Sequence, residues 1–397
     1  MPRILPFLVV LIAVAFFTKI DVFFYLLYAL FGIHFLGRLW ARRSIAAVTL
    51  QRRHDQRIFL GENLAVEVNV HNRSWLPVLW LRLADTVPAD LMPGLAFRRV
   101  ISLLPRERLA LSYNLYGRRR GYYELGPLVG LGGDLLGTLT HEIRQAEGDS
   151  VIVYPKIVPL RELGFPSQSP FGTLPSRERI FEDPSRIQGV RDYQPGDSLR
   201  KMDWKTSARL GSLQVRRYEP AISLETAIFL NLAREDYAQA ERYQATELGI
   251  VIAASLAVHL VEKRQAVSLA SNGSDPLAQT PGVTPWLPLR KGRAHLMDLL
   301  DLLARIEVGA EGQAQPFLDL LSRRSLGLPW GSTLLVVTAR EVEGLMDALL
   351  ALRRRGLVVI LVLTAPDRDS ALTAQRADQI GVQALSIWSE KSLDVWR

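Results

Sequence analysis

The chain begins with a long apolar stretch, Ile4–Leu36, whose main interruption is a short polar segment that ends at Asp21. One helix over the whole stretch would be about 50 Å long at ~1.5 Å per residue. The hydrocarbon core of a bilayer is only ~30 Å thick. We therefore expect residues 1–43 to form a transmembrane hairpin with the arms Ile4–Phe17 and Val22–Leu36.

Basic residues predict the orientation of this hairpin. Arg3 precedes it, and five arginines follow it within residues 38–53. By the positive-inside rule both ends face the cytoplasm, so the bulk of the chain is expected there. A cleaved signal peptide fits less well, because the apolar stretch continues past Asp21 and no small-x-small cleavage site precedes the basic cluster.

Residues 44–158 show a different pattern, with short segments in which apolar and polar residues alternate, for example at 64–70, 79–83 and 109–115. Alternation bounded by Gly, Pro and Asn is typical of half-buried strands. We expect an antiparallel β-sandwich of immunoglobulin-like type. The basic and aromatic run Arg118–Tyr123 raises nucleic-acid binding, but a hairpin turn at Gly121 explains it more simply.

Residues 159–220 begin with a segment rich in Pro, Ser and Gly, which predicts a connector between domains. From 221 to 397 apolar runs alternate with long helical patterns. Runs without alternation, such as Leu357–Leu363, are typical of parallel strands that are covered on both faces. This order predicts a Rossmann-like α/β domain, so the fold class is α/β plus all-β behind a membrane hairpin.

Composition narrows the chemistry. A chain of 397 residues has room for two or three domains. The absence of cysteine excludes disulfides, Cys-ligated zinc, iron–sulfur clusters and a thiol nucleophile. The net charge of +8 is modest for this length, and part of it flanks the apolar stretch. We therefore expect a membrane contact and no nucleic-acid partner.

The most unusual segment is a charged signature within the connector. Its candidate residues are Arg191, Asp192, Tyr193, Pro195, Gly196, Asp197, Arg200, Asp203, Trp204 and Lys205. Asp192, Asp197 and Asp203, together with Lys205 and several arginines, could supply an acid/base pair, but the chain has no HExxH motif, no Ser/His/Asp set and no phosphate-binding Gly-rich loop. We expect these carboxylates to pair with arginines and the two aromatic residues to be packed. The signature would then be a latch between domains or an interaction surface, without enzymatic activity.

The signature string RDYQPGDSLRKMDWKTSARLGSLQVRRYE closely resembles that of the bacterial domain-of-unknown-function family 58, whose members pair it with a von Willebrand factor type A-like domain. The strings RRRGYYELGP, GDLLG, VYP and LPLRKGRAHLMDLL extend the resemblance over nearly the whole chain. Residues 134–137 read Asp-Leu-Leu-Gly where related sequences usually read Asp-Pro-Phe-Gly.

This resemblance implies a bacterial inner-membrane protein that works as an adaptor or scaffold with a MoxR-type AAA+ ATPase in envelope-related complex assembly. Type A domains bind Mg²⁺ through an Asp-x-Ser-x-Ser motif after their first strand. Here Asn231, Ala233 and Glu235 stand at those positions, and Arg340 follows a later strand where a ligand would be expected. The metal site is therefore expected to be degenerate, with no metal or cofactor bound.

Two other functions stay open. A hydrolase would use Asp197 or Asp203 as a general base in a concave pocket, and the pKa of that carboxyl group would be shifted. An anionic-lipid or nucleic-acid binder would use Arg118–Arg120 and the arginines near Arg200, with an affinity that falls steeply as salt rises.

Overall fold

The structure is a computed structural model, and it divides into two compact units, Met1–Tyr154 and Pro155–Arg397. The finer four-part division made from the sequence stays a prediction. The residues that the structure describes are 10, 12, 14, 16, 21–92, 96–134, 140–145, 148–160, 182–195, 197–220, 225–278, 285–309, 315–365 and 370–389.

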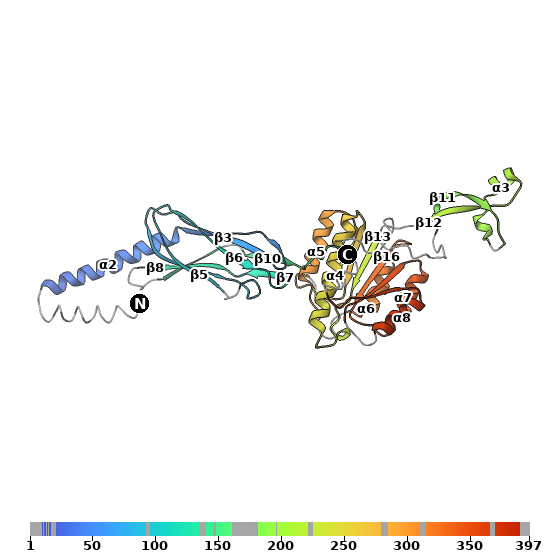
Figure 1. Ribbon diagram of the computed structural model, residues 1–397. Helices are drawn as coiled ribbons and strands as arrows, with labels where there is room; N and C mark the ends of the chain where they lie inside the picture. The colour runs from blue at the N-terminus through green and yellow to red at the C-terminus, as the bar shows by residue number, and fades with distance from the viewer. Residues whose placement is uncertain are drawn as a thin grey trace. The chain divides into compact units, whose positions relative to one another are not determined.

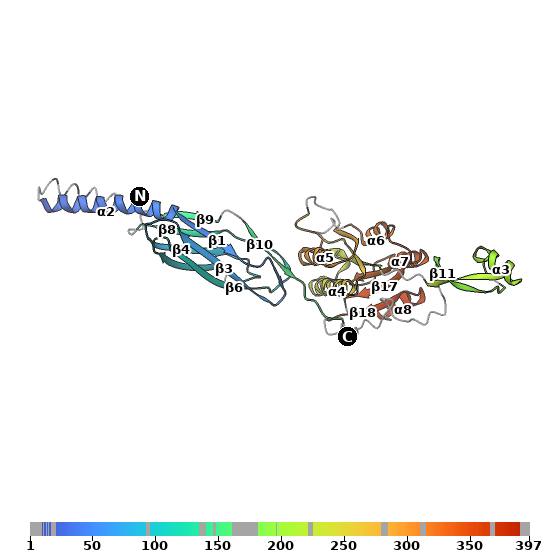
Figure 2. The same ribbon diagram turned by 90° about the horizontal axis from the view of Figure 1, so that it is seen from above.

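The first unit opens with a long apolar helix, α2 (Asp21–Ala46). It contains the expected arm Val22–Leu36 and continues to Ala46, because its last turns bury Ala41 and Ile45 against the sheets that follow. The other expected arm, Ile4–Phe17, lies for the most part outside the described residues, so the hairpin stays a prediction. By length and composition α2 could cross a membrane, and none of its apolar window is buried. Much of the helix extends beyond the strands of the first unit (Figure 2).

The rest of the first unit consists of short strands in three sheets. One sheet has the antiparallel order β1-β3-β6, and another has the antiparallel order β5-β4-β8-β9. In the third, β10 pairs parallel with β2 and antiparallel with β7. The strands are β1 (Val48–Arg53), β2 (Arg57–Phe59), β3 (Asn63–Asn72), β4 (Val78–Thr86), β5 (Ala96–Leu103), β6 (Arg108–Tyr116), β7 (Gly121–Leu125), β8 (Leu128–Gly133), β9 (Thr140–Arg144) and β10 (Asp149–Tyr154).

Alternation along these strands produces the core of the first unit. In β3, Val66 and Val68 are fully buried while Glu67 between them is exposed. They share one cluster with Leu81 of β4 and residues from the other strands. A Cβ on Gly130 of β8 would lie 3.2 Å from the Leu50 side chain of β1, so two of the sheets pack face to face. The expected half-buried strands are therefore present, while the immunoglobulin-like type stays a prediction.

Residues 182–220 of the second unit form a hairpin where a connector was expected. Strand β11 (Glu182–Asp192) pairs antiparallel with β12 (Gln214–Pro220), and a 3₁₀ turn, η1 (Leu199–Lys201), and a short helix, α3 (Trp204–Leu210), lie between them (Figure 1). We call residues 189–216 the signature lobe. These strands were not expected because residues 182–192 and 214–220 lack the regular apolar and polar alternation that marks segments 64–70 and 109–115.

A six-stranded sheet forms the centre of the second unit, in the order β15-β14-β13-β16-β17-β18. Every neighbouring pair is parallel except β14 with the edge strand β15. The strands are β13 (Glu225–Leu230), β14 (Ala266–Ser271), β15 (Trp286–Arg290), β16 (Thr333–Thr338), β17 (Val358–Leu363) and β18 (Gln383–Ser386). This mixed sheet with helices agrees with the expected α/β class.

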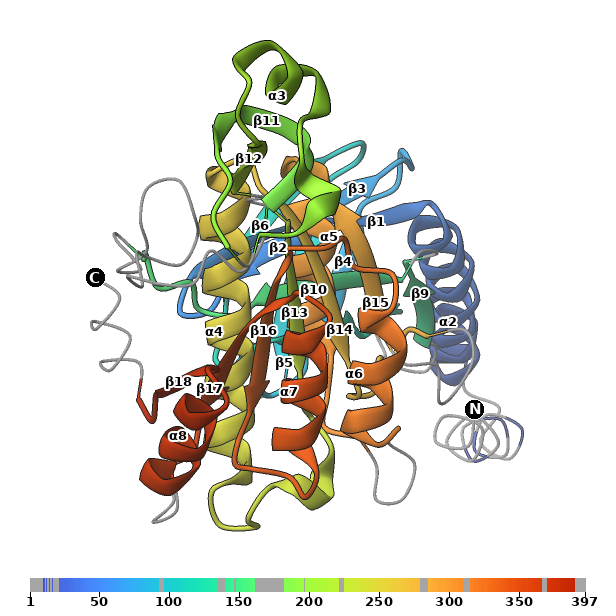
Figure 3. The same ribbon diagram turned by 90° about the vertical axis from the view of Figure 1, so that its right-hand side faces the viewer.

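Helices cover both faces of this sheet. The side chains of Phe229 and Val336 share a core with α6, α7 and α8. On the opposite face Gly249 of α4 approaches Leu230 and Val337, and α5 packs on α4; α4 and α7 lie on opposite sides of β16 (Figure 3). The α4 helix is also apolar enough to cross a membrane, but 78% of its window is buried, which identifies it as a core helix. The helices are α4 (Arg242–Glu262), α5 (Arg293–Arg305), α6 (Phe317–Ser325), α7 (Leu345–Arg354) and α8 (Ser370–Gln379), with a 3₁₀ turn η2 (Arg234–Asp236) after β13.

Candidate functional site

An ion pair closes the loop at the start of the signature lobe. The guanidinium of Arg191 donates two hydrogen bonds to the carboxylate of Asp197, at 2.6 and 2.5 Å. The amide of Gln194 donates a third hydrogen bond to the same carboxylate, at 2.9 Å. The Arg191 hydrogen bond first, and the Gln194 amide second, hold the pKa of Asp197 below its ordinary value. Asp197 is therefore an anion that fixes the loop.

Asp203 plays a similar part at the start of α3. Its carboxylate caps the helix by accepting a hydrogen bond from the Thr206 amide at 3.0 Å. It also accepts a hydrogen bond from Nε of Arg216 in β12, at 3.1 Å. The Thr206 amide is the largest cause, followed by Arg216, of a pKa below the ordinary value. A paired carboxylate with a lowered pKa is a poor general base, so these contacts argue against the hydrolase hypothesis.

A third network joins α3 to the strands. The side-chain amide of Gln214 donates to the carboxylate of Asp192. The Ser207 hydroxyl accepts a hydrogen bond from the backbone amide of Gln214 at 2.8 Å and donates one to the backbone carbonyl of Asp203 at 2.7 Å. All three signature carboxylates are thus used inside the lobe, where they hold its loops and helix to the hairpin.

The side chains that face outward are of a different kind. Trp204 is 65% exposed, Leu199 is also 65% exposed, and Leu210 is 59% exposed. The expected packing of Trp204 is therefore wrong: it occupies the first position of α3, and the residue that α3 buries is Ser207. Other signature residues lie near the surface as well, since Tyr193 is half-buried and Pro195, Arg200 and Lys205 are exposed, whereas Gly196 lies outside the described residues.

A separate polar cluster lies at the carboxyl edge of the parallel sheet, after β13, β14 and β16. The side-chain amide of Asn231 donates to Asp236 at 2.7 Å and to the Thr338 hydroxyl at 3.1 Å. Its carbonyl oxygen accepts from the side-chain amide of Asn272 at 3.0 Å. The Tyr237 hydroxyl donates to the Asn231 backbone carbonyl, and its burial raises its pKa. Asn231 is fully buried, so these bonds satisfy an amide at the aspartate position of the metal motif.

Ala233 and Glu235 stand at the other two positions of that motif, and their contacts are not those of metal ligands. Ala233 is buried, and its amide donates to the side chain of Asn231 at 3.1 Å. Glu235 is exposed in η2, and its backbone carbonyl lies 3.5 Å from the Arg340 guanidinium. Within the described ranges no three His, Cys, Asp or Glu side chains converge as metal ligands would.

Asn272 is a member of this cluster that the sequence pattern did not single out. It directly follows β14, a parallel neighbour of β13, so its place beside Asn231 could have been inferred from the strand order. Asp236 was considered from the sequence only as a loose metal ligand together with Glu235; in the structure it lies in the η2 turn and accepts a hydrogen bond from Asn231.

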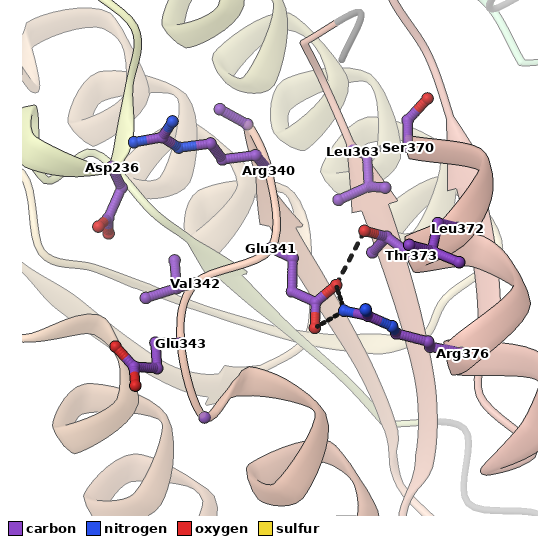
Figure 4. Close-up of a pocket in the computed structure, with 12 residues that line it drawn as sticks. Asp236, Arg340, Glu341, Val342, Glu343, Leu363, Ser370, Leu372, Thr373 and Arg376 are labelled. Atoms are coloured by element: carbon purple, nitrogen blue, oxygen red, sulfur yellow. Dashed lines mark hydrogen bonds and ion pairs between the residues drawn. The ribbon is translucent and has the colours of Figure 1, made fainter. Parts of the chain in front are cut away.

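A pocket of about 630 Å³ lies beside this cluster. Figure 4 shows acidic and basic side chains around it, with Asp236, Arg340 and Glu343 toward one side and Arg376 on the other. The Glu341 carboxylate accepts a hydrogen bond from the Thr373 hydroxyl at 2.9 Å and pairs with Arg376 at 3.4 Å. This pairing ties α8 to the loop before α7.

Comparison with known proteins gives one family match and one curated relative. Residues 189–374 match the model of "Protein of unknown function DUF58". The uncharacterized protein YeaD of Bacillus subtilis (strain 168) is 24% identical over 356 residues, which cover 88% of this chain and 83% of YeaD.

Solved structures show only weak likeness. A CARDB domain of the PF1109 protein from Pyrococcus furiosus is 18% identical and has a TM-score of 0.20, covering 27% of this chain and 91% of that domain. A cohesin module from Clostridium perfringens is 14% identical and has a TM-score of 0.22, covering 27% of this chain and 96% of that module. The DUF58 match contains the signature string, whose resemblance to this family it confirms.

Proposed function

We propose that this protein is a membrane-anchored adaptor or scaffold without enzymatic activity, which presents the signature lobe to a partner protein. The observation that supports this proposal is that the lobe uses its charged and its aromatic side chains differently. Its carboxylates are used internally, while Trp204 is 65% exposed at the start of α3. Exposed tryptophans are the side chains that most often dominate binding energy at protein interfaces.

The exposed charges on α3 indicate that the partner surface is acidic. On α3, Lys205 and Arg209 are both exposed and lie four positions apart, where like charges repel. Keeping two cations beside Trp204 therefore carries a small local cost, which contact with an acidic partner surface would offset. Because internal hydrogen bonds hold the lobe in shape, little ordering is needed on binding.

The identity of the partner and the place of action come from family resemblance. We propose a MoxR-type AAA+ ATPase as the partner and envelope-related complex assembly at the bacterial inner membrane as the setting. The second unit would be a von Willebrand type A-like domain; its mixed six-stranded sheet and the polar cluster at Asn231 support this assignment. The helix α2, with a second arm in a hairpin, would anchor the chain and leave its bulk in the cytoplasm.

The test is co-purification of the full chain with the MoxR-type ATPase of the same organism, in detergent. Trp204→Ala removes an exposed ring and leaves the internal bonds of the lobe in place, so we expect the ATPase to be lost. Trp388→Ala is the matched control, because Trp388 is 57% exposed outside the lobe. Equal recovery with both variants would place the interface elsewhere, and no recovery with the unchanged chain would remove this partner.

A further inference from the structure

The last turns of α2 are built into the first unit. Ala41 and Ile45 belong to its hydrophobic core. The indole of Trp40 donates a hydrogen bond to the carbonyl of Pro77, at 3.0 Å. A Cβ on Gly132 of β8 would lie only 3.0 Å from the Ile45 side chain, so helix and sheet are in close contact. The end of α2 therefore has a fixed orientation with respect to the sheets.

Two loops lie at the same end of the unit as this helix end. Loop 73–77 follows β3, whose last residue, Asn72, pairs with Val48 just after α2. The buried side-chain amide of Asn72 donates to the carbonyl of Leu76 and to the carbonyl of Leu104, both at 2.9 Å. It thereby ties loop 73–77 to loop 104–107. The Arg106 amide adds a 3.0 Å bond to the Ser74 carbonyl.

These two loops expose large apolar side chains. Trp75 is 74% exposed, and Leu104 is 67% exposed. Both belong to loops whose backbone is held by hydrogen bonds, so their exposure is a fixed feature of the fold. Arg106 adopts a left-handed backbone conformation with φ 59°, which a non-glycine residue keeps only where the surroundings enforce it.

Exposed basic side chains lie on the same two loops and on the last turns of α2. Arg73 and Arg106 are exposed on the loops, and Arg42 and Arg43 are exposed on the last turns of α2. The one carboxylate within the two loops, Glu107, accepts a hydrogen bond from the Leu104 amide, at 2.5 Å. Leu39, Arg42, Arg43, Ala46 and Ala47 line a hollow of about 490 Å³, which combines apolar walls with two guanidinium groups.

The length of α2 determines the level at which this surface would lie in a membrane. From Asp21 to Leu39 the helix measures about 28 Å at ~1.5 Å per residue, close to the ~30 Å of the hydrocarbon core. Trp40 would then lie at the boundary with the headgroups, where tryptophan is enriched. The bond from Trp40 to Pro77 brings loop 73–77 to the same level.

We propose that Trp75, Leu104 and the exposed arginines of the two loops and of α2 dock the first unit onto anionic lipid headgroups. This inference rests on the membrane anchoring in the proposed function. A bilayer is the occupant because this surface is continuous with the helix that would cross it, and because arginines near the surface attract anionic lipids. Docking would hold the first unit against the membrane and give it a defined orientation.

The test uses the absence of cysteine, which lets one introduced thiol carry one dye. An environment-sensitive fluorophore is attached to the full chain at Trp75→Cys, Leu104→Cys, Ile33→Cys or Gln56→Cys. Each protein is reconstituted into phosphatidylcholine vesicles, with or without phosphatidylglycerol, and quenched with brominated lipid. Ile33 reports on the anchor itself, and Gln56 is an exposed control beyond the far end of β1.

We expect lipid quenching at 33, 75 and 104 and its absence at 56. Quenching at 75 and 104 should weaken without phosphatidylglycerol, and also when Arg73→Gln and Arg106→Gln are combined with the Leu104→Cys label. If position 33 is quenched but 75 and 104 are not, the lipid contact is refuted and the anchor stands. If position 33 is not quenched either, the anchor fails and the lipid contact fails with it.

Discussion

Arg52 and Asp85 form a fully buried, bidentate ion pair in the core of the first unit. The Arg52 guanidinium also donates to Asp149 at 2.9 Å and to the Gly126 carbonyl at 2.7 Å, while the Tyr113 hydroxyl donates to Asp85 at 2.6 Å. Burial alone would lower the pKa of Arg52, but the hydrogen bond and the charge of Asp85 raise it above its ordinary value. The pair links β1 to β4 across sheets that share a core.

Removing one partner of this pair should strongly destabilise the first unit. Asp85→Ala leaves the guanidinium of Arg52 buried with less compensation, and breaking a buried pair in this way typically costs about 3–5 kcal/mol. The measurement is urea unfolding of the full chain in detergent, followed by a probe in the first unit. Glu142→Ala is the matched control, because its pair with Arg144 is exposed and its loss should cost less than about 0.5 kcal/mol. Equal effects of the two substitutions would contradict the structural role of the buried pair.

The same cluster predicts a loss of stability at alkaline pH. Burial first, and then the hydrogen bond to Asp85, raise the pKa of Tyr113 well above its ordinary value of 10.0. Above that pH the unfolded chain releases the Tyr113 proton while the folded chain retains it. The free energy of unfolding of the first unit should therefore fall as pH rises beyond 10. Tyr113→Phe should be less stable near neutral pH and should show a shallower alkaline decline; an unchanged slope would refute this assignment.

In the signature lobe, Asp203 should control the order of α3 without touching a partner. Asp203→Ala removes the cap at Thr206 and the pair with Arg216, so the amides of α3 should exchange with solvent severalfold faster. Asp203→Ser keeps a capping oxygen and should recover most of the protection. Trp204→Ala should leave exchange unchanged, since its ring is exposed. If Trp204→Ala also loosens α3, the ring has an internal structural role.

Strand alternation located β3, β4 and β6 at residues 64–70, 79–83 and 109–115, and the apolar run Leu357–Leu363 located β17, because burial on one or both faces leaves a direct mark on the sequence. The expected arm ended at Leu36, where the apolar stretch ends; α2 continues to Ala46 because Ala41 and Ile45 pack on strands far along the chain. The pairing of β11 with β12 is likewise a contact between distant segments.

The sites were only partly predictable. The arginine pairing of Asp197 and Asp203 follows from the density of opposite charges in the signature. The exposure of Trp204 could not be inferred, since α3 has only seven residues and its buried face shows no apolar repeat. The partners of Asn231 come from strands and turns that only the sheet order brings together.

The buried amide of Asn231 gives the last prediction. In Asn231→Asp, the group 2.7 Å from Asp236 changes from a donor to a carboxylate, so a buried acidic group lies beside the half-buried Asp236. The pKa of the new carboxyl should then lie above its ordinary ~3.9, with the added stability present below that pH and lost as pH rises through the raised value. We expect the second unit to lose about 1–3 kcal/mol at neutral pH, and less in acid. Asn114→Asp, at an exposed position on β6, should change little at either pH. Thermal unfolding with and without Mg²⁺ completes the test: restored stability in Mg²⁺ would mean that the single substitution suffices to recreate a cation site, contrary to the degenerate geometry at Ala233 and Glu235.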